Sequence, residues 1–448
     1  MWIKTEINGE KFTVECRPEE RALDLLRRLG FHSVKEGCGE GECGACSIFW
    51  RDRLINACLL PAPRMDGESI RTLEGLQRET ESLRRHFVEA GAVQCGFCTP
   101  GFVLRAFDYE RGGGEADEEA VKRALDGNLC RCTGYRKIIE AVTRSAGDSG
   151  RSTSEKRRSG SLPLSLSEKP GTVLRPKPDG EMAYLRPGTL DEAAAMLDRY
   201  PGYLPSCGAT DLWIRLRRAE LPEGIIDLTG IDGLESVWRE EGRLHIGAEV
   251  TLSTLLEEPL VERDLPMLHD AASHFASHQV RNLATIGGNI VNDSPAADLI
   301  PVLVAYGASI TLHSSRGERT LLLEEILNGF KSLAIDREVI VSIGIPLTAH
   351  RWYYRKVGTR AELNISKLSL ALLRTADGYR ISGASLNPWT RRFRHLEALL
   401  ERGDASEREL EEAIEKDTDP SGSFRSTKHY RRRVLLNMLE EALRELDG

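Results

Sequence analysis

The alternation of apolar and polar residues near the N-terminus predicts a β-hairpin followed by a helix. Two short alternating runs flank Asn8-Gly9, and this dipeptide is typical of the type I′ turn that joins antiparallel strands. The segment ERALDLLRRLG then repeats leucine at helical spacing and ends at Gly30, a residue type that often follows a helix C-terminus. Another strand is predicted at residues 47–50, after a loop rich in glycine and cysteine.

The pattern changes along the rest of the chain. Residues 81–142 have helical periodicity, and residues 147–180 are rich in Ser, Gly, Pro and Lys, which predicts an exposed linker. A new unit begins near Met182, where Thr189 and Glu192 have the spacing of a capping box. Short strands and helices then alternate, and two charge-rich helices are predicted between residues 406 and 446. This order of elements predicts a multidomain α+β protein.

The composition is that of an ordinary soluble protein. The chain has 448 residues, enough for about three domains, and a net charge of −8. This balance gives no reason to expect a nucleic acid partner, and no apolar run is long enough to span a bilayer. We therefore expect a cytoplasmic protein that binds neither nucleic acid nor membrane. The ten cysteines are too sparse for a disulfide scaffold, and eight of them form two groups, which favours metal or cluster ligation.

The first cysteine group lies in GCGEGECGACSIFWRDRLINAC, with the spacing C-x4-C-x2-C-x11-C. The first three positions have the spacing of a plant-type [2Fe-2S] loop, and the order hairpin, helix, loop is that of a β-grasp ferredoxin. The interleaved glycines supply the backbone freedom that such a loop needs. They also spell G-x-G-x-x-G, but a cysteine fills one variable position and two more flank the match, so dinucleotide binding is disfavoured. The expected ligands are Cys38, Cys43, Cys46 and Cys58.

The second cysteine group has the pattern C-x2-C-x31-C-x-C. Each pair precedes an amphipathic run, so two helix N-termini are expected to point at one site, where their dipoles stabilise thiolate charge. Structural zinc is the alternative for all eight thiols, although C-x4-C-x2-C and C-x-C are poor zinc-knuckle spacings. The remaining cysteines, Cys16 and Cys207, are isolated and are expected to be small buried residues. The expected ligands of the second site are Cys95, Cys98, Cys130 and Cys132.

Two loops of small residues follow in the later part of the chain, PSCGATDL at Pro205 to Leu212 and TIGGN at Thr285 to Asn289. Loops with free N–H groups can hold a pyrophosphate, and simple turns are the alternative. His274 and His278 stand four residues apart and could share a metal, but the glutamate of a zincin motif is absent between them. An ordinary helix is the favoured interpretation of that pair.

Taken together, these motifs resemble the iron–sulfur and FAD subunits of the xanthine dehydrogenase type in the molybdenum hydroxylase family. The resemblance covers nearly the whole chain, and it rests on GCGEGECGACS, QCGFCTPGF, GNLCRCTGYRKI, GATDL, LATIGGNIVNDSPAADLIP and KVGTR. It implies a plant-type 2Fe-2S ferredoxin domain at residues 1–77, a helical 2Fe-2S domain at 78–145 and a linker at 146–181. A vanillyl-alcohol-oxidase-like FAD domain at 182–349 and a C-terminal α+β domain at 350–448 complete the chain.

The resemblance also implies the residues that contact FAD. These are the two glycine loops and four further positions, of which Phe275 and Ile340 could equally be core residues. In full they are Pro205, Ser206, Cys207, Gly208, Ala209, Thr210, Asp211, Leu212, Phe275, Thr285, Ile286, Gly287, Gly288, Asn289, Asp298, Ile340 and Lys356.

By the same resemblance, electrons pass from a molybdopterin cofactor on a separate large subunit through two 2Fe-2S clusters to FAD and then to NAD+. The substrates implied are hypoxanthine and xanthine, the assembly is a heterotetramer with two copies of each chain, and no catalytic residue lies on this chain. Carbon monoxide, aldehyde and nicotinate dehydrogenases use similar modules, and a stand-alone NADH-linked reductase is a further alternative. A plain electron carrier without flavin and a zinc-bearing scaffold are alternatives of other classes, which a visible absorption spectrum would separate.

Overall fold

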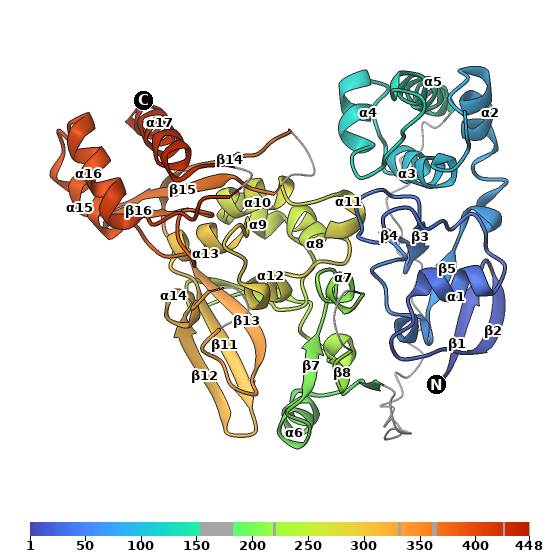
Figure 1. Ribbon diagram of the computed structural model, residues 1–448, viewed down its shortest axis with the longest axis horizontal. Coiled ribbons are helices and arrows are strands. Elements are labelled where there is room, and N and C mark those ends of the chain that lie inside the picture. Colours follow the sequence, from blue (N-terminus) through green and yellow to red (C-terminus); the bar gives the residue numbers. More distant parts are fainter. Residues whose placement is uncertain (153–181, 218–220, 330–332, 361–364, 424–425, 448) are drawn as a thin grey trace. The chain divides into compact units, whose positions relative to one another are not determined.

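The computed structural model describes residues 1–152, 182–217, 221–329, 333–360, 365–423 and 426–447. The chain divides into two compact units (Figure 1). The first comprises Met1–Arg186 with Ala209–Ile225 and Ser277–Leu283, and the second comprises the remainder. The proposed linker at 146–181 lies mostly outside the described residues, but its first residues continue helix α5 (Arg136–Ser152). The helical part therefore extends beyond residue 145, where we expected it to end.

The first unit begins with a five-stranded sheet of order β2-β1-β5-β3-β4, in which β1 pairs antiparallel with β2 and parallel with β5. The turn between β1 and β2 has φ angles of 55° at Asn8 and 86° at Gly9, which confirms the predicted I′ geometry. Helix α1 packs its leucines against the inward residues of the sheet. The elements are β1 (Trp2–Ile7), β2 (Glu10–Glu15), α1 (Ala22–Arg28), β3 (Ser47–Trp50), β4 (Arg53–Asn56), η1 (Ala62–Met65), β5 (Ser69–Arg71) and η2 (Leu73–Leu76).

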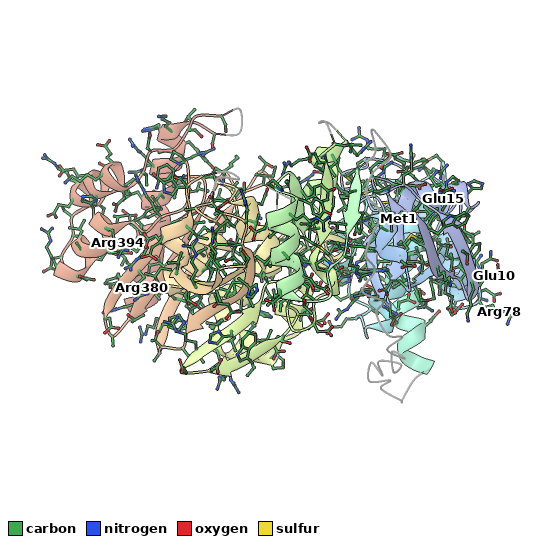
Figure 2. All side chains as sticks on the ribbon, turned by 90° about the horizontal axis from the view of Figure 1, so that it is seen from below. Met1, Glu10, Glu15, Arg78, Arg380 and Arg394 are labelled. Carbon is green, nitrogen blue, oxygen red and sulfur yellow. The ribbon has the colours of Figure 1, made fainter. Side chains whose placement is uncertain are left out.

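Strand β2 is one edge of this sheet, and its outward residues are mostly charged or polar. Figure 2 labels Glu10 and Glu15 at its two ends. Exposed charges on an edge strand oppose pairing with another chain. The charged residues of β2 therefore disfavour the addition of a strand from another chain at this edge.

Helices make up the next part of the first unit, as the periodicity predicted. They pack around a core that includes Phe87, Phe102 and Ile138. Asp117 caps α4 by accepting a hydrogen bond from Ala120 N at 2.8 Å. The helices are α2 (Glu81–Glu89), α3 (Thr99–Arg111), α4 (Glu118–Ala124) and α5.

Two segments of the expected FAD domain at 182–349 belong to the first compact unit. One contains α7 (Leu212–Leu216) and the other α11 (His278–Arg281). His278 Nε2 lies 2.9 Å from Asp108 Oδ2 of α3, and Asn282 Nδ2 donates to Leu54 O of β4 at 2.7 Å. These polar contacts bind α11 to both earlier parts of the unit.

The second unit contains an antiparallel five-stranded sheet of order β12-β11-β13-β10-β9. Thr189 caps α6 by accepting from Glu192 N at 3.1 Å, as predicted, while the Glu192 carboxylate accepts from Gly188 N rather than completing the box. The sheet strands are β9 (Val237–Glu240), β10 (Arg243–Gly247), β11 (Ser309–Ser314), β12 (Gly317–Leu322) and β13 (Val339–Pro346). The helices are α6 (Leu190–Arg199), α8 (Leu252–Glu257), α9 (Pro259–Asp264), α10 (Pro266–Ser273), α12 (Ile286–Asn292), α13 (Ile300–Tyr306) and α14 (Leu323–Ile326). Of the remaining elements, β6 (Ala183–Leu185) belongs to the first unit, and β7 (Tyr203–Ser206) and η3 (Leu228–Gly230) belong to the second. Strand β8 (Gly224–Asp227) begins in the first unit and ends in the second.

The C-terminal part forms a second layer of the same unit. Helix α13 is buried along its whole length and packs against both β13 and β15, which joins the expected FAD and C-terminal domains into one compact unit. Ser406 caps α16 in a capping box, and the two predicted C-terminal helices are present. The elements are β14 (His350–Val357), β15 (Leu368–Thr375), β16 (Gly378–Ser382), α15 (Arg394–Arg402), α16 (Glu407–Asp417) and α17 (Lys428–Asp447). Among the described residues, no helix is long and apolar enough to cross a membrane.

Candidate iron–sulfur and flavin sites

The first cysteine group is shaped by the loop between α1 and β3. A Cβ on Gly37 would lie 2.7 Å from Cys43 Sγ, so only glycine leaves room for that sulfur. Gly44 has a φ of 66°, and a Cβ there would meet Gly127 O at 2.6 Å. The glycines are therefore required by close approach, as the spacing predicted.

The four thiols of this group lie in two pairs. Cys38 and Cys43 are hydrogen-bonded to each other, and Cys46 is hydrogen-bonded to Cys58. Backbone amides also point at the sulfurs: Glu40 N donates to Cys38 Sγ at 3.3 Å, and Cys38 N donates to Cys43 Sγ at 3.3 Å. The hydrogen bond from Cys43, together with such amides, lowers the pKa of Cys38 to about 5. The thiolate is the form that binds metal.

The second cysteine group is positioned by helix termini. Cys98 is the N-cap of α3, as predicted, whereas α5 starts at Arg136 after a turn in which Tyr135 has a φ of 68°. Cys132 Sγ lies 3.5 Å from Cys95 Sγ, and Cys98 is hydrogen-bonded to Cys130. Burial opposes ionisation of Cys130, but hydrogen bonds, first among them that of Thr133, lower its pKa overall.

In each cysteine group the four thiols therefore lie in two pairs. Four-thiolate zinc needs all four sulfurs around one ion, whereas a two-iron cluster needs two sulfurs on each iron. Thiolates about 2.3 Å from a tetrahedral metal stand about 3.8 Å apart, and the Cys95 to Cys132 separation of 3.5 Å is close to this. The donor set fits two [2Fe-2S] clusters better than zinc.

The second glycine loop forms the start of α12. Thr285 Oγ1 accepts from Gly288 N at 3.1 Å, and a Cβ on Gly287 would meet Ala248 O at 2.7 Å. Asn289 Oδ1 is buried and has no hydrogen-bond partner among the described residues. A buried acceptor without a donor beside a tight glycine turn suits a polar ligand such as FAD.

The first glycine loop joins β7 to α7, and Ala209 within it has a φ of 62°. Ser206 is buried, while Cys207 is only partly buried, contrary to our expectation for an isolated cysteine. Cys16 is fully buried, as expected. The loop itself is divided between units, because Gly208 belongs to the second and the residues after it to the first.

Three of the remaining expected FAD positions lie together in the second unit. Lys356 Nζ donates to Asp298 Oδ2 at 2.8 Å and to His274 O, next to Phe275, at 2.9 Å. Burial raises the pKa of Asp298 in spite of Lys356, and Asp298 Oδ1 has no partner within the described structure. Ile340 is a buried residue of β13 that pairs with Leu312.

The histidine pair does not lie on one helix, contrary to the sequence interpretation. His274 is the C-cap of α10, and His278 begins α11 after a break at Ala276, where φ is 41°. The two residues belong to different units. His278 pairs with Asp108 instead.

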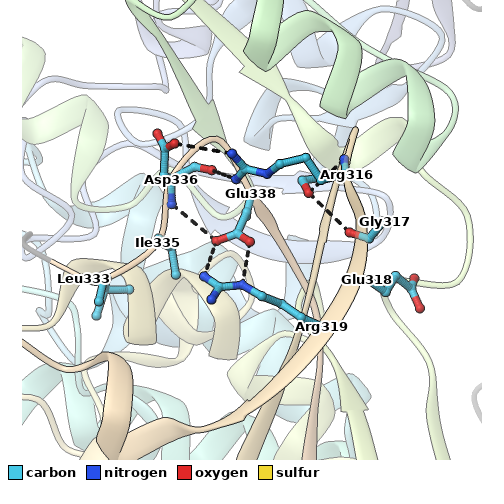
Figure 3. Close-up of a pocket in the computed structure, with 10 residues that line it drawn as sticks. Arg316, Gly317, Glu318, Arg319, Leu333, Ile335, Asp336 and Glu338 are labelled. Atoms are coloured by element: carbon cyan, nitrogen blue, oxygen red, sulfur yellow. Dashed lines mark hydrogen bonds and ion pairs between the residues drawn. The ribbon is translucent and has the colours of Figure 1, made fainter.

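A polar cavity of about 610 Å³ lies beside the β11–β12 hairpin (Figure 3). Its arginines already have carboxylate partners: Arg319 binds Glu338 through two contacts of 2.7 Å, and Arg316 Nη1 lies 3.7 Å from Asp336. The cavity lining includes none of the residues that the sequence proposed. We assign it no part in cofactor binding.

Sequence reasoning missed two asparagines that support the cysteine loops. Asn56 Nδ2 donates to Gly41 O at 2.8 Å, and Asn128 Nδ2 lies 3.5 Å from Gly44 O. Each stands two residues before a predicted cysteine ligand, in the patterns NAC and NLC. That repeated N-x-C pattern was the available signal. Gln279, which donates to Asn128 Oδ1 at 2.8 Å, carries no signal in the sequence.

Three protein-family models match the chain in consecutive segments. A 2Fe-2S iron-sulfur cluster binding domain matches residues 5–62, a [2Fe-2S] binding domain matches 72–143, and the FAD binding domain in molybdopterin dehydrogenase matches 180–348. These matches and the paired thiols define the class of protein, an electron-transfer flavoprotein with two iron–sulfur domains. The chain carries the iron–sulfur and FAD electron-transfer domains of the molybdenum hydroxylase family.

Relatives and solved structures agree with this family. The xanthine dehydrogenase/oxidases of Mus musculus and Gallus gallus are 30% and 29% identical over 433 and 432 residues, covering 81% and 78% of this chain. The chain spans 32% of the length of each. A carbon monoxide dehydrogenase structure from Hydrogenophaga pseudoflava has 26% identity and a TM-score of 0.55, over 59% of this chain and 96% of that one. Quinoline 2-oxidoreductase from Pseudomonas putida 86, at 21% identity, TM-score 0.55 and the same 59% and 96% coverage, shares the fold.

Proposed function

We propose that this chain is the iron–sulfur and FAD electron-transfer subunit of a xanthine dehydrogenase-type molybdenum hydroxylase. Its partner is a large subunit that carries molybdopterin and oxidises hypoxanthine and xanthine, and the final acceptor is NAD+. When bound, 2Fe-2S clusters exchange single electrons and FAD exchanges two. The residues of this chain hold these groups at fixed separations and adjust their potentials.

The difference in exposure between the two cysteine groups carries this proposal. Cys95 and Cys132 are exposed, whereas Cys46 and Cys58 are buried, at 3% and 1% exposure. Exposed apolar side chains from the same part of the chain accompany the exposed pair, namely Val93, Phe97 and Leu129. Exposed apolar groups favour protein contacts. Electrons would therefore enter from the partner at the second cysteine group and move inward to the first.

A direct route between the groups supports this order. Leu129 N, adjacent to Cys130, donates a hydrogen bond of 3.0 Å to Cys43 O. One hydrogen bond therefore joins the backbone of a ligand in one group to the backbone next to a ligand in the other. A Cβ on Gly101 would stand only 2.1 Å from Gly44 O, so α3 packs directly on the first cysteine loop.

The test is affinity purification of the chain from cells that make it, with analysis of metals, flavin and associated chains. We expect a larger molybdenum-containing chain, FAD, and about four irons per copy, because two two-iron clusters require them. Purified protein should reduce NAD+ when given hypoxanthine or xanthine. Recovery of the chain with iron and flavin but without molybdenum would favour a stand-alone NADH-linked reductase and remove the xanthine assignment.

A second candidate is the same role in a carbon monoxide dehydrogenase, because a structure of that name covers 59% of this chain. Aldehyde and nicotinate are further substrates of this chemical type. The purified complex is assayed with each substrate, and oxygen is offered as the alternative acceptor. Activity with carbon monoxide and none with purines would establish the second candidate instead.

A further inference from the structure

Arg217 contacts the first cysteine loop, although it follows α7 in a segment far along the sequence. Its Nη1 donates to Gly39 O at 2.9 Å and lies 3.4 Å from Cys38 O, and its Nη2 lies 3.2 Å from Glu36 Oε1. A Cβ on Gly39 would stand 1.8 Å from Arg217 Nη1. The guanidinium therefore occupies the space that glycine leaves open.

The contact with Gly39 reaches a sulfur through one peptide group. Gly39 C=O and Glu40 N–H belong to the same peptide, and Glu40 N donates to Cys38 Sγ at 3.3 Å. A cation bound at the oxygen of a peptide polarises it and strengthens the hydrogen bond that its N–H donates. Arg217 thus acts on Cys38 Sγ by its charge and through this peptide.

We propose that Arg217 is a positioning residue that raises the reduction potential of the first cluster. The inference rests on the proposed function, in which Cys38 is a ligand of that cluster. Reduction adds one electron, breaks no bond and makes the site one charge more negative. Hydrogen bonds to the sulfurs and nearby net charge set the potential of such clusters, so a cation at this position stabilises the reduced form.

The surrounding charges limit the size of the effect. Glu36 also pairs with Arg21 at 3.0 Å, and Arg21 pairs with Asp24 at 2.6 Å, so these four side chains are neutral together. Loss of Arg217 leaves them one charge more negative. Because the Arg217 side chain is 39% exposed, water screens part of this change. We expect the ratio of reduced to oxidised cluster at a fixed potential to fall about threefold to tenfold, and tenfold corresponds to about 59 mV.

The experiment is a redox titration of the purified full-length protein, with its partner if one is present. Dithionite is the reductant, and electron paramagnetic resonance follows each cluster separately. Arg217→Gln should lower the potential of the first cluster and leave the second unchanged, and Arg217→Lys should lower it less. Arg28→Gln is the matched control, because Arg28 lies in the same compact unit as Arg217, is half exposed, and donates to Glu15 O and Glu20.

Several outcomes would overturn the proposal. A change of less than threefold in Arg217→Gln, an equal change of both clusters, or an equal change in Arg28→Gln would each do so. If the signal of the first cluster is lost in Arg217→Gln, the potential of that cluster is measured in Arg217→Lys instead. An unchanged potential in Arg217→Lys refutes the proposal. Absence of two-iron signals from the unaltered protein would instead contradict the proposed function itself.

Discussion

Gly101→Ala tests whether the second cysteine domain packs on the first loop as tightly as the structure indicates. Alanine in a helix is favoured over glycine by about 1 kcal/mol. Here, however, the added Cβ would stand 2.1 Å from Gly44 O, far inside the 3.4 Å at which ordinary contact begins. That atom belongs to the backbone and cannot rotate away. Overpacking costs about 1 to 3 kcal/mol, and a contact this short with a backbone atom belongs to the upper half of that range, about 2 to 3 kcal/mol. After subtraction of the gain of about 1 kcal/mol in helix propensity, we expect a net local destabilisation of about 1 to 2 kcal/mol.

Hydrogen exchange followed by mass spectrometry measures this effect, because the amides of α3 report local opening. They should exchange about 5 to 30 times faster in Gly101→Ala than in the unaltered protein. Gly147→Ala is the matched control within helix α5, where the new Cβ would meet Ala116 Cβ at an ordinary 3.6 Å. Its helix should be protected more strongly, by up to about 1 kcal/mol. Equal or stronger protection of α3 in Gly101→Ala would refute the proposed packing.

Three further predictions concern the sites. Cys43→Ser should remove one of the two cluster signals and leave FAD bound, and loss of flavin as well would contradict separate modules. Lys356→Met should release FAD and destabilise the fold by about 3 to 5 kcal/mol, because it leaves the buried Asp298 without its ion pair. Denaturant unfolding measures this loss, and the double variant with Asp298→Asn should recover much of the stability. Burial, opposed by Asp108, lowers the pKa of His278 from its usual value of 6.5. Below that pH the unfolded segment therefore binds more protons than the folded one. The amides of α11 should accordingly lose protection as the pH falls below about 6.5. His278→Gln should remove that step in hydrogen exchange, and a step of the same size would exclude His278 as its source.

Features with local causes could be predicted from the sequence. The Asn8-Gly9 turn needs two positive φ angles, and these residue types adopt them readily. Thr189 caps α6 through an amide three residues away. The glycine and cysteine spacing of the first loop reflects how closely a sulfur approaches the backbone, as the contact between Gly37 and Cys43 illustrates. Such features depend on a few neighbouring residues, so the sequence carries their full signal.

Features that depend on distant contacts could not be predicted. Gln279 and Asn128 are 151 positions apart, and Arg217 and Gly39 are 178 apart. No periodicity or motif signals that an arginine after one short helix will donate to a carbonyl oxygen beside a cysteine ligand.

The sequence by itself therefore determined the local elements, the two cysteine groups and the chemistry that their spacing permits. Only the tertiary structure decided that the thiols lie in pairs, that α11 and Arg217 belong to the iron–sulfur unit, and that the two cysteine groups meet at Leu129 and Cys43. The reason is that these contacts arise from the packing of whole domains, in which each side chain takes the partner that the fold brings within reach.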